Sequence, residues 1–100
     1  MKKVNFSVAL KNGEGKNIQE NGKDVMMSAI IADTVLACGD CKSAARMYTV
    51  GMAIYGAKGE VEIEDQDWTE LKRIITAAQM RVIVKGPIEK LMETAKEDKK

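Results

Sequence analysis

Cys38 and Cys41 form a CxxC pair and are the clearest candidates for chemistry in this sequence. In a disulfide oxidoreductase, the reactive cysteine of such a pair lies at the amino terminus of a helix, where the helix dipole stabilises the thiolate. Cys41 fits that position, because Asp40 directly before it is a residue type that caps helices. Cys38 does not fit, because it closes an apolar helical segment instead of following a strand. The pattern therefore disfavours thiol exchange.

The same two cysteines would hold zinc only if two chains came together. Structural zinc sites use four Cys or His ligands, and this chain has two cysteines and no histidine. Two copies related by a two-fold axis would supply four cysteines, so a zinc-clasped dimer stays open as an alternative. The favoured interpretation involves no cofactor: Cys38 is a small core residue and Cys41 is a partly exposed thiol.

A run of carboxylates between residues 60 and 70 is the second candidate site. Its members are Glu60, Glu62, Glu64, Asp65, Asp67 and Glu70. Magnesium and calcium sites need carboxylates that converge on one point. Alternate residues of a strand would instead line up along one face, and Asp65 and Asp67 suit the start of a helix. We therefore expect a solvated acidic rim and no metal site.

Composition and charge exclude several classes of function. The chain has no histidine, which removes the commonest general base and the usual partner of a nucleophilic Ser or Cys, so we expect a protein that is not an enzyme. Sixteen Lys and Arg against fifteen Asp and Glu leave a formal net charge of +1, and this balance disfavours nucleic acid as a partner. A local basic arm remains at Lys2, Lys3, Lys11 and Lys16.

The strand signals lie in two places. Alternating apolar residues predict a strand from Val4 to Leu10, and turn residues on either side of 16–20 predict a strand that returns beside it. Residues 1–23 are thus expected to form a β-hairpin arm. Residues 60–64 alternate as well and predict a short exposed strand that would pair with this arm.

Two helices are predicted between these strands. Residues 25–38 are apolar on nearly every side, so this helix, capped by Asp24, must be buried nearly all round. Gly39 suits a left-handed helix end, and Asp40 would cap a second helix over 41–55, giving an antiparallel helical hairpin. The rest of so small a chain covers only part of the first helix, and we expect a second copy to cover the remainder. The predicted interface consists of Val25, Met26, Met27, Ile30, Ile31, Met47 and Met52.

The last third of the chain predicts at least one more helix. It starts near Asp65 and Asp67 and carries Trp68 as its core anchor. Residues 81–86 fit either a strand or a helix, and Pro87 suits the first turn of a final helix over 87–96. Residues 97–100 are all charged and are expected to form a solvated tail.

These signals together predict a single α+β domain over residues 1–100. Its body, 24–96, is α-rich, with a helical hairpin, one or two further helices and the short strand 60–64. A small antiparallel β-hairpin sheet completes it.

Three segments of the second half resemble small proteins encoded by phages and prophages. They are Ile54-Tyr55-Gly56 at a helix end, the acidic strand Glu60-Val61-Glu62-Ile63, and Asp65-Gln66-Asp67-Trp68 opening a helix with Leu71, Lys72 and Ile75. The resemblance implies a bacterial or viral accessory protein and transfers no catalytic residue.

The expected function is a non-enzymatic, homo-oligomeric interaction or assembly protein, whose partners are itself and an unidentified protein. A small-ligand or nucleotide-sequestering oligomer, with pockets at its subunit boundaries, is a further alternative. The sequence has neither an export signal nor an apolar run of the ~20 residues that cross a bilayer, so no membrane partner is expected. We expect the protein in the cytoplasm of a bacterial host cell or associated with a virion.

Overall fold

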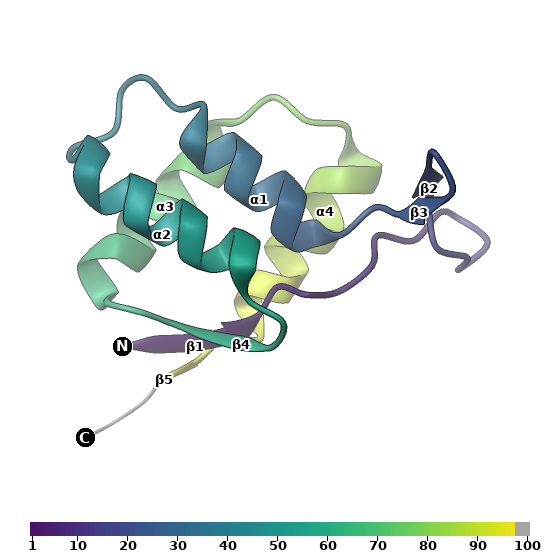
Figure 1. Ribbon diagram of the computed structural model, residues 1–100, viewed down its shortest axis with the longest axis horizontal. Helices are drawn as coiled ribbons and strands as arrows, with labels where there is room; N and C mark the ends of the chain where they lie inside the picture. Colours follow the sequence, from purple (N-terminus) through teal and green to yellow (C-terminus); the bar gives the residue numbers. More distant parts are fainter. Residues whose placement is uncertain (98–100) are drawn as a thin grey trace.

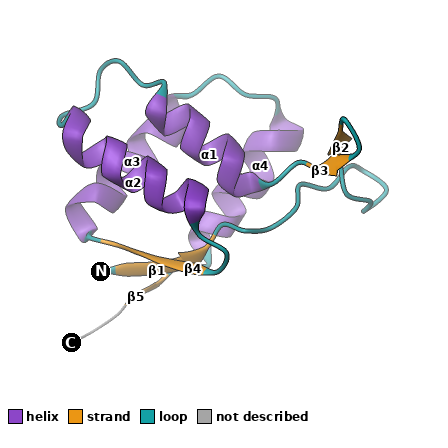
Figure 2. Ribbon diagram, viewed as in Figure 1, coloured by secondary structure: helices purple, strands orange, loops and turns teal. Residues whose placement is uncertain are grey.

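Four helices and five short strands make up residues 1–97, the part of the chain that the computed structural model describes (Figure 1). Helices α1 and α2 form the front layer, α3 and α4 form the layer behind it, and β1, β4 and β5 run along the lower edge (Figure 2). The predicted α+β class is confirmed. The strands are β1 (Lys2–Asn5), β2 (Gln19–Glu20), β3 (Lys23–Asp24), β4 (Glu60–Ile63) and β5 (Lys96–Glu97), and the helices are α1 (Met27–Leu36), α2 (Ala44–Gly56), α3 (Asp65–Ala77) and α4 (Val82–Glu93).

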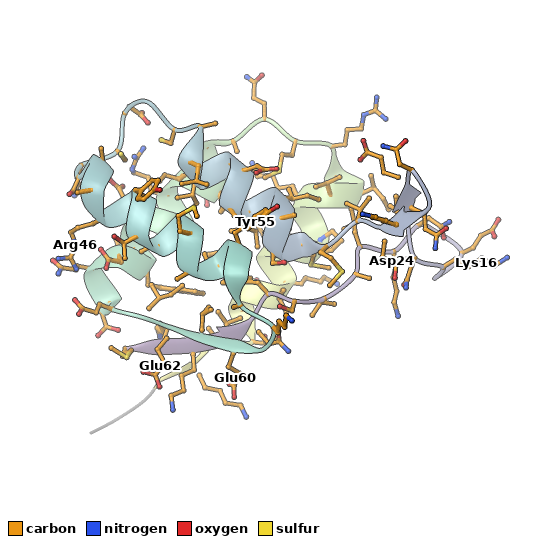
Figure 3. All side chains as sticks on the ribbon, viewed as in Figure 1. Lys16, Asp24, Arg46, Tyr55, Glu60 and Glu62 are labelled. Carbon is orange, nitrogen blue, oxygen red and sulfur yellow. The ribbon has the colours of Figure 1, made fainter. Side chains whose placement is uncertain are left out.

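The larger sheet has the strand order β4-β1-β5, with both neighbours antiparallel to β1. Val4 lies opposite Val61 in this register. The alternation predicted for residues 60–64 is confirmed in β4, because Val61 and Ile63 are buried while Glu60 and Glu62 are exposed. Figure 3 shows both glutamates projecting away from the helices. The predicted pairing of this strand with the amino-terminal strand is also confirmed.

The amino-terminal strand is shorter than predicted, because β1 ends at Asn5. The Asn5 side chain accepts a hydrogen bond from the Ser7 backbone N–H at 2.9 Å, and the Ser7 hydroxyl donates to the Ala57 carbonyl at 2.7 Å. These two bonds turn the chain out of the sheet. The strand therefore pairs with β4 and β5, and not with the returning strand of the predicted hairpin.

The hairpin arm exists, but it starts only at Leu10. Three backbone hydrogen bonds of 2.8 Å each close its base: Leu10 N–H donates to the Val25 carbonyl, Ile18 N–H to Leu10 and Val25 N–H to Ile18. Its tip is the β2–β3 turn at Asn21 and Gly22, whose φ angles of 53° and 79° are those an Asn-Gly hairpin turn requires. The arm projects at the right of Figure 1.

The predicted helical hairpin is formed by α1 and α2, but its boundaries and caps differ. The first helix begins after Met26, whose side chain makes no capping hydrogen bond, so Asp24 is not its cap. Asp24 instead accepts hydrogen bonds from Asn17 and Gln19 and stays within the arm. The reason is that the arm ends in β3, which keeps Asp24 extended and two residues short of the helix.

The connection between these helices is also longer than predicted. The first helix ends at Leu36 and not at Cys38, and Gly39 does not adopt a positive φ. The second helix is capped by Ser43, whose hydroxyl accepts from the Arg46 backbone N–H, and not by Asp40. Both cysteines therefore lie in a loop over 37–43, so Cys41 does not start a helix.

The third helix matches its prediction closely. It begins after Glu64, and Asp65 and Asp67 lie in its first turn, where carboxylates favour the helix dipole, although neither occupies the cap position itself. Trp68 is 8% exposed, which confirms its role as a core residue.

The fourth helix extends further towards the amino terminus than predicted. Residues 82–86 are helical, and Pro87 lies inside the helix instead of in its first turn. The helix ends at Glu93, and Lys96 and Glu97 pair with β1. The backbone of Glu97, the first residue of the predicted charged tail, thus belongs to the sheet, whereas 98–100 lie outside the described residues.

One hydrophobic core joins the front and rear layers to the sheet. Its largest fully buried side chains come from the sheet side, from all four helices and from the arm: Phe6, Leu10, Ile31, Val35, Ile54, Leu71, Ile75 and Ile88. The radius of gyration is 13.2 Å, close to the ~13 Å of a folded chain of this length.

Candidate functional site

The loop over 37–43, which we refer to as the CxxC loop, favours the protonated form of its first thiol. Cys38 Sγ donates a hydrogen bond to the Asp40 carboxylate at 3.0 Å. This bond to Asp40, above all other causes, raises the pKa of Cys38 above its ordinary value of 9.0. Thiol exchange needs the thiolate, so the geometry disfavours the redox interpretation. Both cysteines are free and half-buried.

The CxxC loop is anchored to α3 by Glu70 and Arg73. The Lys42 backbone N–H donates to Glu70 Oε2 at 2.7 Å, and Arg73 Nε donates to Glu70 Oε1. Arg73 also reaches Asp40, with a nitrogen 3.7 Å from its carboxylate. The bond from Arg73, followed by the one from Lys42, lowers the pKa of Glu70. Glu70 is thus a buried structural carboxylate.

The carboxylate run is divided among separate ion pairs. Arg46 binds Asp67 at 2.7 Å and Glu64 at 3.0 Å, and Figure 3 shows Arg46 at the far left of the molecule. Glu62 lies 3.3 Å from the Lys3 ammonium, and Asp65 lies 2.9 Å from the amino-terminal ammonium. Within residues 1–97, no three His, Cys, Asp or Glu side chains are grouped closely enough to hold a metal ion.

The predicted basic arm is not one surface. Lys2 and Lys3 belong to β1 at the lower edge of the sheet, whereas Lys11 and Lys16 lie in the projecting arm. Figure 3 shows Lys16 at the far right of the molecule. Its ammonium is 3.9 Å from Glu14, so part of its charge is compensated locally. The structure therefore gives no concentrated positive patch from these four residues.

The predicted interface is largely internal. Met27, Ile31 and Met47 are buried in the core, so they form no surface for a second copy. Val25, Met26 and Ile30 are half-buried, and Met52 alone of the set is clearly exposed, at 46%. The prediction fails for the buried residues because α2 and α3 both pack on α1. They cover the part of this helix that a second copy was expected to cover.

The exposed apolar surface of the front layer lies on α2. Tyr48 and Tyr55 are 61% and 60% exposed, and with Met52 they follow the i, i+4, i+7 spacing of one helix face. Leu36, 40% exposed, lies beside this face on the neighbouring helix, over Gly51. We refer to Leu36, Tyr48, Met52 and Tyr55 as the α2 face.

The exposed side of α2 has almost no charged side chains. The exposed residues of the helix are Ala44, Ala45, Arg46, Tyr48, Thr49, Met52, Ala53, Tyr55 and Gly56. Arg46 is the charged residue among them, and it is paired with Glu64, directly before α3, and with Asp67 in the first turn of α3. Surface helices of monomeric proteins normally carry several charges on the outer side. The same lack of charge is visible in the sequence, where Arg46 is the one charged residue between residues 43 and 57.

Comparisons with protein-family models, with curated proteins and with solved structures find no match to this chain. In the part of the chain that the structure describes, every helix is too short or too polar to span a lipid bilayer.

Proposed function

We propose that this protein is a non-enzymatic interaction domain that forms homo-oligomers through the α2 face. The observation that carries the proposal is the exposure of Tyr48, Met52 and Tyr55 on one side of a helix whose one charge is already paired. Tyrosine and methionine are enriched at protein interfaces and charge is depleted at their centres, so the α2 face has the composition of an interface core.

A two-fold dimer is the simplest arrangement that uses this surface. The face is self-complementary when two α2 helices pack antiparallel, because Tyr48 of one copy then lies near Tyr55 of the other. Ala44 and Ala45, four and three residues before Tyr48 and both exposed, leave room for the tyrosine rings of the other copy. Leu36 supports this arrangement, because it extends the apolar surface from α2 onto α1. The contact would therefore involve both helices.

The size of the face sets the strength of the contact. A helix of 13 residues is about 20 Å long and about 10 Å wide. A standard interface takes about 800 Å² from each partner, so this surface alone supports a weak, reversible dimer. A phage or prophage accessory role, with a further protein partner, belongs to the same proposal and rests on the resemblance of the second half of the chain.

Sedimentation velocity over about a hundredfold range of concentration tests the proposal. We expect a monomer–dimer equilibrium for the natural chain and at least a tenfold weaker one for Met52→Lys, because a lysine would be desolvated at the contact. The matched control is Val82→Lys, which changes an apolar side chain that is 84% exposed on α4, away from the α2 face. A natural chain that stays monomeric throughout would overturn the proposal.

The competing assembly is a dimer clasped by zinc through Cys38 and Cys41. Native mass spectrometry of protein purified without chelator separates the two, since it reports subunit number and bound metal in one spectrum. One zinc per two chains, lost in Cys41→Ser together with the dimer, would favour the clasp. A metal-free dimer that is indifferent to Cys41→Ser and sensitive to Met52→Lys is the result expected here.

A further inference from the structure

A hollow of about 460 Å³ lies between α3 and α4. These two helices form the layer behind α1 and α2 (Figure 1). The volume of the hollow is within the range of small-molecule sites and near the lower end of that range. We refer to it as the Trp68 groove. It is lined by Lys2, Trp68, Lys72, Ile75, Thr76, Glu89, Met92, Glu93 and Ala95.

The floor of the Trp68 groove is apolar. Trp68 and Ile75 come from α3 and Met92 comes from α4, and all three side chains are more than nine-tenths buried. Trp68 also lines a second, shallower hollow that opens along the outer side of α3. The part of the indole that remains accessible therefore faces the groove and this extension, where an apolar ligand group would pack against it.

The rim of the Trp68 groove carries opposite charges on its two sides. Lys72 lies on α3 and Lys2 on β1, whereas Glu89 and Glu93 lie one turn apart on α4. Among residues 1–97, Lys72, Glu89 and Glu93 make no ion pair and no side-chain hydrogen bond with one another. Oppositely charged side chains that can reach each other in a shared hollow normally pair. No ion pair joins Lys72 to Glu89 or Glu93, so the positive and the negative side both remain available to a ligand.

We propose that the Trp68 groove binds a small zwitterion with an apolar side chain, of the size and chemistry of a free α-amino acid. The ligand carboxylate would meet the Lys72 ammonium, and the ligand ammonium would meet Glu89 and Glu93. The side chain would lie on Trp68, Ile75 and Met92. A purely anionic ligand would be repelled by the two glutamates and a purely cationic one by Lys72, so the pattern of charges favours a molecule that carries both.

The chain reports binding through its own fluorescence, because Trp68 is its one tryptophan. The experiment titrates the full chain with L-phenylalanine in low salt and follows emission excited at the red edge of the indole band. The analogues 3-phenylpropionate, which lacks the ammonium, and phenethylamine, which lacks the carboxylate, are titrated in the same way. We expect a saturable change with L-phenylalanine and at least tenfold weaker binding of either analogue.

Two substitutions assign the charges. Lys72→Gln should weaken L-phenylalanine binding at least fivefold and should not weaken the binding of phenethylamine, which has no carboxylate. Glu89→Gln should also weaken L-phenylalanine binding at least fivefold, but it should not weaken the binding of 3-phenylpropionate, which has no ammonium. The matched controls are Lys90→Gln on α4 and Glu60→Gln on β4, which lie outside the groove and should not alter the titration. Thermal unfolding of each variant shows that it is folded.

Three results would overturn the assignment to a zwitterion. They are no saturable change with L-phenylalanine, equal binding of the three probes, and equal effects of the Lys72→Gln and Lys90→Gln substitutions. The same titration on Met52→Lys keeps this test separate from self-association, because the groove and the α2 face belong to different helices. Binding should be unchanged in that variant.

Discussion

The side chain of Leu36 lies directly over Gly51, where α1 and α2 come together. A Cβ atom at position 51 would meet Leu36 Cγ and Cδ2 at 2.9 Å, and Val35 Cγ1 at 3.6 Å. Such an approach is closer than real Cβ atoms make, so an alanine at this position would displace Leu36. Because Gly51 is three residues from Tyr48 and four from Tyr55, this contact also sets the position of Leu36 at the margin of the α2 face.

Gly51→Ala should therefore show a stability effect that depends on Leu36. Alanine in a helix interior is favoured over glycine by about 1 kcal/mol, and in the Leu36→Ala background this gain should appear nearly in full. With Leu36 present, the cost of moving its side chain should offset most of the gain. Urea denaturation of the four proteins of this double-mutant cycle measures the coupling. Equal effects of Gly51→Ala in both backgrounds would contradict the close contact.

Glu70 should make the stability of the protein depend on pH on the acid side. Arg73, and then the Lys42 backbone N–H, lower the pKa of Glu70 below its ordinary value of 4.5. The unfolded chain therefore binds this proton more readily than the folded chain. The stabilisation is complete above the ordinary pKa and is lost as the pH falls through the lower pKa of the folded state.

The variant Glu70→Gln tests this dependence. It keeps the shape of the side chain but removes the charge that accepts from Arg73 and Lys42, so the melting temperature should fall at neutral pH and the fall should shrink towards pH 3. Glu20→Gln, an exposed glutamate in the arm, is the matched control and should follow the natural chain across the pH range. If the difference in melting temperature between Glu70→Gln and the natural chain stays constant from pH 7 to 3, Glu70 is excluded as the titrating group.

The parts of the fold that were predictable are those where pattern and burial agree. The alternation in β4 and the Asn-Gly turn of the arm are local signals, and the structure follows both. The caps of α1 and α2 were not predictable, because Asp24 and Asp40 are good capping residues whose carboxylates are bound elsewhere in the fold. Their partners come from the arm in one case and from Cys38 in the other.

The α2 face was harder to predict for a physical reason. A helix in a two-layer fold buries only one of its sides. Both sides of α2 are apolar, so the spacing of its apolar residues could not distinguish the buried side from the exposed one. Met47 and Ile54 lie inside, and Tyr48 and Tyr55, each one residue further along, lie outside. The Trp68 groove was even harder to predict from the sequence, because only the packing of α4 on α3 brings Lys72 and Glu89 to the same hollow.

Lys85 should stabilise the helical form of the segment before Pro87. Its ammonium donates to the Thr76 carbonyl at 2.7 Å and to the Ala78 carbonyl at 3.0 Å, at the carboxyl end of α3. Those carbonyls have few partners inside their own helix, and the dipole there favours a positive charge. The contact ties α4 to α3 over a stretch whose residues, Val82 and Ile83, are exposed and contribute little burial.

Lys85→Met, which keeps the length of the side chain and removes the charge, should lower the free energy of unfolding by about 1 kcal/mol. It should also speed amide hydrogen exchange in α4 on the amino-terminal side of Pro87 more than on the other side, because Pro87 removes a hydrogen bond within the helix and leaves that side dependent on the contact with α3. Lys58→Met, an exposed lysine in the loop before β4, is the control and should leave both quantities close to those of the natural chain. Equal exchange on both sides of Pro87 in Lys85→Met would mean that packing on α3, and not this lysine, holds the start of α4.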